Sequence, residues 1–157
     1  MFSRRHFIGF MVAGIALLPA GLRSQALVTF DKSSLEIETK TGTHKFTVEM
    51  AVSDRQQAQG LMFRRSMAPN AGMLFDYKRP TRITMWMKNT YIPLDMLYID
   101  RQGTIVGYHE RAVPGSLEVI TSKNPVNAVL EVNSGTVSRL GIAVGDKVIH
   151  PAFETKK

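Results

Sequence analysis

Six residues in the central and C-terminal parts of the sequence have side chains that can take part in binding or catalysis. A carboxylate whose protonation is tuned by its surroundings can act as an acid or a base. An indole ring can stack on a planar ligand, and cationic or amide groups can orient a polar one. These six residues predict a ligand-binding site: Arg64, Trp86, Lys88, Asn89, Asp95 and Glu131.

The two carboxylates lie within apolar runs that have the pattern of strands. Side chains alternate between the two faces of a strand, so Asp95 shares a face with Leu97, and Glu131 shares a face with Val129. A buried carboxylate is costly unless a cation or several N–H donors compensate its charge. We therefore predict that Asp95 pairs with Arg64. Such a pair either joins two loops or lines a pocket.

The segment around the only tryptophan follows the same alternation. Met85 and Met87 lie on one face, where flexible thioethers are expected to fill gaps in the core. Trp86 lies on the other face with Arg82 and Lys88. Either the stems of these two cations cover the ring, with a cation–π contribution, or the ring is a platform that stacks a sugar or another planar ligand.

Copper binding is a further alternative, because six of the seven methionines after residue 26 fall between Met62 and Met96. Thioethers are suitable ligands for Cu(I), and Met85 with Met87 would supply two of them. A site also needs further sulfur or imidazole ligands that converge on the ion. The three histidines in this part of the chain share no ligand spacing, so we predict no metal and no cofactor: His44, His109 and His150.

An enzymatic function is the remaining alternative. The sequence has no Gly-x-Ser-x-Gly turn, no His-Glu-x-x-His helix and no phosphate-binding loop. A small hydrolase or transferase would have to use Asp95 or Glu131, and that carboxylate would have to be open to a cleft. A binding module predicts instead a shallow groove with an exposed aromatic ring and no carboxylate of perturbed pKa.

Short strands are the elements that must position these residues. Residues 35–50 alternate around Gly42 as a hairpin does, and Ser53, Gln56 and Gly60 mark the start and the end of a two-turn helix. Further strand-like runs cover residues 73–75, 81–88, 94–100, 104–113 and 128–133, and a short helix capped by Ser134 and a last strand follow. We predict a mainly β (α+β) fold, a single compact barrel-like or sandwich-like domain of about seven or eight short, mostly antiparallel strands with two short helices.

The first 26 residues have the features of an export signal. An apolar run over residues 7–18 is shorter than the ~20 residues that span a bilayer, so no stable membrane span is expected after processing. The segment SRRHFI, residues 3–8, resembles a twin-arginine signal, and the general secretory route stays open as the alternative. We expect cleavage near Ala26, one domain over residues 27–157 and a periplasmic location.

Composition narrows the classes of partner. The chain has 157 residues, of which 44% are hydrophobic, and it contains no cysteine, which excludes disulfides, thiolate metal sites and a cysteine nucleophile. Without the arginines of the leader, 17 basic residues stand against 13 acidic ones, a net charge of +4 without clusters. We therefore predict a small-molecule or envelope ligand, no nucleic acid, and a monomer or weak oligomer.

Three segments carry a resemblance to a known family: GLMFRRSMAPNAGMLF (60–75), MWMKNTYIPLDMLYID (85–100) and VLEVNSGTVSRLGIAVGDKV (129–148). In order and spacing they resemble the DUF192 (UPF0127) family of small bacterial and archaeal domains, which are often made as exported proteins. The family has no assigned biochemical function, so the resemblance names no activity. Because its members are often exported, the resemblance implies an exported envelope domain. We interpret it as a binding or accessory module with a groove around Trp86, Asn89, Asp95 and Arg64.

Overall fold

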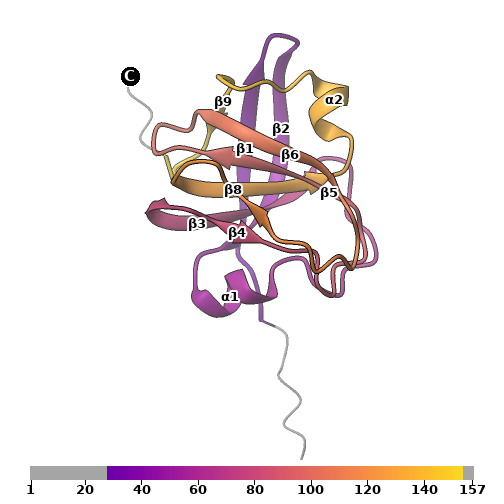
Figure 1. Ribbon diagram of the computed structural model, residues 1–157. Helices are drawn as coiled ribbons and strands as arrows, with labels where there is room; N and C mark the ends of the chain where they lie inside the picture. The colour runs from indigo at the N-terminus through magenta and orange to yellow at the C-terminus, as the bar shows by residue number, and fades with distance from the viewer. Residues whose placement is uncertain (1–27, 154–157) are drawn as a thin grey trace, which may run out of the picture.

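A curled seven-stranded β-sheet forms most of the molecule (Figure 1). The computed structural model describes residues 28–153, so the expected export signal and its cleavage position near Ala26 lie outside the described residues. Strands follow one another across the sheet in the order β6-β5-β8-β3-β2-β1-β9, and a separate ribbon pairs β4 with β7. The mainly β, barrel-like prediction is thereby confirmed.

The strands are short, as predicted, and their bounds place the site residues. They are β1 (Lys32–Thr39), β2 (Gly42–Ala51), β3 (Ala71–Thr81), β4 (Thr84–Met85), β5 (Leu94–Ile99), β6 (Ile105–Ala112), β7 (Ile120–Thr121), β8 (Val126–Asn133) and β9 (Lys147–Ile149). All strand pairs are antiparallel except β2 with β3.

The sheet curls until its two edge strands meet at one end. β1 and β2 cross the remaining strands steeply in Figure 1, and Thr104, just before β6, forms a bridge with Lys147 of β9. The Val148 N–H also donates to the carbonyl of Gly103 at 2.7 Å. A Cβ at Gly103 would lie 2.4 Å from the carbonyl oxygen of Val148, so this closure requires a glycine. The result is a half-barrel with one closed end.

Helix α1 (Asp54–Gln59) connects the two parallel strands and lies at the lower end of the molecule in Figure 1. Its start has the predicted capping box, in which the Ser53 side chain accepts from the Gln56 N–H and the Gln56 side chain accepts in return from the Ser53 N–H. Gly60 ends the helix with a φ of 49°. A Cβ there would lie 3.0 Å from the Phe75 ring, which brings this turn tightly against β3.

Helix α2 (Thr136–Leu140) starts one residue later than predicted. The residue before it is Gly135, with a φ of 82°, and no side chain of the helix's own first turn caps it. The prediction that Ser134 caps this helix was therefore wrong. Gly141, which ends the helix with a φ of 65°, is in the predicted position.

The predicted strand over residues 81–88 is also shorter in the structure. Only Thr84 and Met85 pair as strand β4, with Thr121 and Ile120 of β7. The predicted alternation nevertheless holds along the whole segment, because Ile83 and Met87 are buried while the residues between them face outward or are half-buried.

Two hydrophobic clusters occupy the two faces of the central strands. One contains Leu74, Leu97 and Leu130 and fills the inside of the curl, together with side chains from β1, β2 and β9. The other contains Met73, Met96 and Val129, together with Leu61, Ile83, Met87 and Ile92 from outside the seven-stranded sheet. Successive residues of β3, β5 and β8 thus belong to different clusters, as strand alternation requires.

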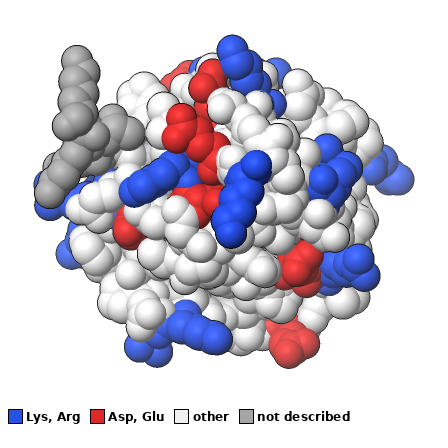
Figure 2. Space-filling model, turned by 90° about the horizontal axis from the view of Figure 1, so that it is seen from above, with Lys and Arg blue, Asp and Glu red and all other residues white. Residues whose placement is uncertain are grey.

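Neither α1 nor α2, the two helices of residues 28–153, has the length and apolar character of a membrane-spanning helix. Basic and acidic side chains are interspersed on the face seen in Figure 2.

Candidate functional site

The two predicted carboxylates face opposite sides of the sheet. Asp95 of β5 pairs with Val132 of β8, whereas Glu131 pairs with the next residue of β5, Met96. Asp95 therefore shares the inner face with Leu97, and Glu131 shares the outer face with Val129, as predicted. One pocket cannot contain both side chains.

Asp95 is fully buried and has no cationic partner among residues 28–153. Its Oδ1 accepts a hydrogen bond from the Arg111 N–H at 2.9 Å, and its Oδ2 accepts one from the Val137 N–H at 3.0 Å. The predicted partner, Arg64, forms an ion pair with Glu49 instead. The Asp95–Arg64 prediction was wrong because backbone N–H groups satisfy the buried carboxylate.

Glu131 lies in a cavity of about 320 Å³ between α1 and β4, hereafter the Glu131 pocket. Residues 57–62 of α1 and the turn after it form one wall, and Phe75 and Tyr77 of β3 form another. Thr84, Met85, Trp86 and Thr90 complete the lining. The volume is at the lower end of the range typical of small-molecule sites.

The carboxyl group of Glu131 is in an apolar environment. The residue is only 4% exposed, and burial raises its pKa to about 8. Burial also raises the pKa of the Tyr77 and Tyr98 hydroxyls, with the charge of Glu131 as the second cause in both. Glu131 is therefore largely protonated at neutral pH, in contrast to the binding-module expectation of an unperturbed carboxylate.

Trp86 has the exposure expected of a ligand-stacking ring. It is 49% exposed at the edge of the pocket, and the ammonium group of Lys88 lies 5.1 Å from its ring centroid. This contact supports the cation–π interpretation for Lys88. Asn89 follows with a φ of 56°, and its carbonyl accepts from the Phe63 N–H at 2.8 Å, so the backbone of Asn89 anchors the turn that ends at Arg64.

The two methionines of the copper hypothesis have different environments. Met87 is 1% exposed and belongs to the outer hydrophobic cluster, so its assignment to the core is confirmed. Met85 is half-buried, lines the Glu131 pocket and accepts a hydrogen bond from the Tyr77 hydroxyl at 3.6 Å. Because Met87 does not line the pocket, these two residues do not form an accessible pair of sulfur ligands for a copper ion.

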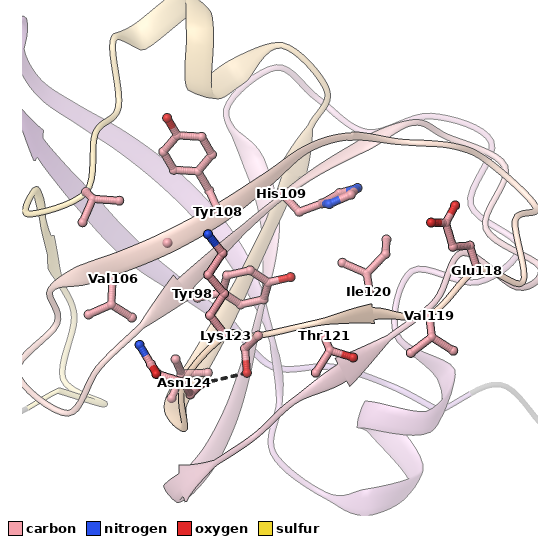
Figure 3. A pocket seen from close by; sticks show the side chains of 14 residues that line it. Tyr98, Val106, Tyr108, His109, Glu118, Val119, Ile120, Thr121, Lys123 and Asn124 are labelled. Atoms are coloured by element: carbon pink, nitrogen blue, oxygen red, sulfur yellow. Dashed lines mark hydrogen bonds between the residues drawn. The ribbon is translucent and has the colours of Figure 1, made fainter.

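A larger cavity of about 490 Å³, hereafter the Tyr98 groove, lies between β6 and β7. In Figure 3 the Tyr98 hydroxyl points into the space between His109 and Thr121. That hydroxyl is buried and has no hydrogen-bond partner among the described residues. None of the six predicted site residues lines this groove, so we place the candidate site in the Glu131 pocket.

A comparison with protein families matches residues 36–150 to DUF192, described as "Uncharacterized ACR, COG1430". The chain belongs to the DUF192 family. The three segments that carry the resemblance come together in the structure, since Gly60, Leu61 and Met62, then Met85 and Trp86, and finally Glu131 all line one pocket.

Two solved structures are similar to this DUF192 chain. One, a candidate transcription regulator from Sinorhizobium meliloti 1021, is 50% identical, with a TM-score of 0.78 over 80% of this chain and 98% of the other. The second, a protein of unknown function from Novosphingobium aromaticivorans DSM 12444, is 34% identical, with a TM-score of 0.74 over 90% of this chain and 99% of the other. A search among curated proteins found no match.

Sequence reasoning missed five polar residues that line the Glu131 pocket: Gln57, Gln59, Tyr77, Thr84 and Thr90. Thr90 directly follows the Trp-Met-x-Asn segment and is buried, so its position beside that segment was an available signal. Tyr77 gave no such signal, because its contact with Met85 depends on how β3 packs against β4.

Proposed function

We propose that this protein is an exported binding module of the cell envelope that holds a small organic molecule in the Glu131 pocket. The observation that carries the proposal is the combination of a half-exposed Trp86 at the edge of the cavity with a buried Glu131 inside it. Trp86 offers a flat apolar surface for stacking, and Glu131 offers a polar anchor in apolar surroundings, which is the usual composition of a ligand site.

Native mass spectrometry of protein purified from its own periplasm tests this proposal. We expect an added mass that disappears on gentle unfolding and is greatly reduced in the Trp86→Ala variant. Leu117→Ala is a matched control, because Leu117 is 68% exposed and does not line the pocket. A spectrum that shows only the bare chain under all purification conditions would contradict a retained ligand.

Export is part of the same proposal, and it is supported by the leader sequence alone. N-terminal sequencing of the exported protein should begin at Leu27 or a close neighbour. Replacing Arg4 and Arg5 by lysines should block export if the twin-arginine route is used. Unchanged export of that variant would favour the general secretory route, and a persistent full-length membrane form would contradict processing.

A second candidate function is general acid–base catalysis by Glu131, because its raised pKa suits proton transfer near neutral pH. Asp95 is not available for this role, since it is fully buried on the other face. If Glu131 is catalytic, the Glu131→Gln variant should retain an unconverted molecule of different mass from the one retained by the parent. The same molecule bound by both proteins would favour simple binding.

A further inference from the structure

Glu131 accepts no hydrogen bond and forms no ion pair with the described residues that line its pocket. Its neighbours on the adjacent strands are Met73 of β3 and Met96 of β5, whose thioethers provide no donor. Among the described residues that line the pocket there is no lysine, arginine or histidine, and Glu131 is the only carboxylate. The acidic group thus faces the cavity without compensation.

Other buried carboxylates of residues 28–153 are compensated within the fold. Asp95 accepts from two backbone N–H groups, and Asp76 accepts from the backbone N–H and the ammonium group of Lys78. Glu131 forms no ion pair or hydrogen bond with any described residue. Because a buried unpaired carboxylate is costly, its charge must be neutralised by a proton or by a group that enters the pocket.

The remaining walls of the pocket are suited to a positively charged group. Phe75, Tyr77 and Trp86 present aromatic rings, whose faces attract cations. Trp86 already holds the ammonium group of Lys88 at 5.1 Å from its centroid. Lys88 is exposed, so an incoming cation can replace it on the ring.

We propose that the ligand of the Glu131 pocket is a small organic cation, an ammonium group on an apolar body, which forms an ion pair with Glu131 and stacks on Trp86. This inference rests on the proposed binding function and names its ligand class. A bare metal ion fits less well, because hard cations require several oxygen ligands. The described residues contain no group of three or more His, Asp or Glu side chains that could hold a metal ion.

Proton release is a consequence that distinguishes this ligand class. Burial raises the pKa of Glu131 to about 8, so a cation that binds at pH 7 must displace the carboxyl proton. As the pH increases toward 8, the affinity for a permanent cation should rise by about tenfold per pH unit. Above pH 8 the affinity should no longer change. Tyr77 and Tyr98 are the titratable groups whose pKa responds to Glu131, and both pKa values are raised, so neither hydroxyl contributes in this pH range.

Choline and its neutral carbon isostere 3,3-dimethylbutan-1-ol are the probes for the test, because they have the same shape and differ in charge. The fluorescence of Trp86, the only tryptophan, reports occupancy directly. Calorimetry in two buffers of different ionisation enthalpy counts the protons released. We expect choline to bind at least about tenfold more tightly than the isostere at pH 8, with release of most of a proton at pH 7.

Glu131→Gln should greatly reduce this preference for the cation, whereas Glu110→Gln, which removes an exposed carboxylate outside the pocket, should leave it unchanged. Equal binding of choline and the isostere, or choline binding that Glu131→Gln does not weaken, would overturn the cationic class while leaving a binding pocket. Absence of choline binding would overturn the class as well. The binding function itself is judged separately, by the mass retained in the native spectrum.

Discussion

The carboxylate of Asp95, on strand β5, caps helix α2 by accepting a hydrogen bond from the N–H of Val137 at 3.0 Å. The helix begins after Gly135, which has no side chain to serve as a cap. Asp95 therefore takes the place of the usual capping residue although it lies 42 positions earlier in the chain. The other carboxylate oxygen of Asp95 accepts a hydrogen bond from the backbone N–H of Arg111, which lies near the end of β6 and has a φ of 56°.

Asp95→Ala should therefore destabilise the protein by about 2–4 kcal/mol, because the buried N–H of Val137 and the partly buried N–H of Arg111 lose their acceptor. Asp95→Asn should cost less, since one amide oxygen can still accept. Urea unfolding at pH 7 measures both variants. Parent-like stability of Asp95→Ala would show that water replaces the carboxylate at both N–H groups.

Arg64 should be energetically independent of Asp95. Its side chain is 40% exposed and pairs with Glu49, so Arg64→Ala should cost no more than about 1 kcal/mol. In a double-mutant cycle of Arg64→Ala with Asp95→Ala the losses should add to within about 0.5 kcal/mol. A coupling well above that value would mean that the two residues meet in solution.

Glu131→Gln should stabilise the ligand-free protein at alkaline pH. The Glu131 pKa is about 8 in the fold against 4.5 for a free side chain. The stability that the protonated carboxyl group contributes is therefore fully present below pH 4.5 and is lost as the pH rises from 4.5 through 8. The variant should match the parent at pH 4 and exceed it at pH 9 by roughly 5 kcal/mol, about 1.4 kcal/mol for each pH unit by which the pKa is raised. Thermal unfolding across pH 4–9 checks this, with Glu110→Gln as the control. A stability difference that does not change with pH would contradict the shifted pKa.

Met87→Ala should cost roughly 2–5 kcal/mol, as other truncations in a packed core do, because Met87 is 1% exposed. Met62→Ala should cost less, since Met62 is half-buried and lines the pocket. Chemical denaturation compares the two. Similar small losses would mean that Met87 is not tightly packed and would revive the hypothesis of a sulfur ligand.

Gly72→Ala should destabilise the strand pair that carries Glu131. A Cβ at Gly72 would lie 2.6 Å from the carbonyl oxygen of Glu131, so β3 or β8 would have to move, at a cost of about 2 kcal/mol or more. Gly107→Ala is a matched strand control, because its Cβ would meet only Tyr98, at 3.5 Å. Equal stability of both variants would show that the strands separate without difficulty.

Several features followed from the sequence because they depend on neighbouring residues. Alternation assigned Asp95 and Glu131 to faces shared with aliphatic side chains, and both faces were as predicted. The capping box of Ser53 and Gln56 also holds, because both residues belong to one turn of helix. The length of β4 was not predictable in this way, since it depends on how much of a partner strand, β7, lies beside it.

The sequence by itself determined the family, the mainly β fold and the face on which each carboxylate lies, because backbone geometry and side-chain alternation act over a few residues. Only the tertiary structure decided that Asp95 caps α2, that Arg64 pairs with Glu49, and that Glu131 shares a pocket with Trp86. These pairings depend on the register between β5 and β8 and on the curl of the sheet. Both arise from the packing of the whole core, which no short segment encodes.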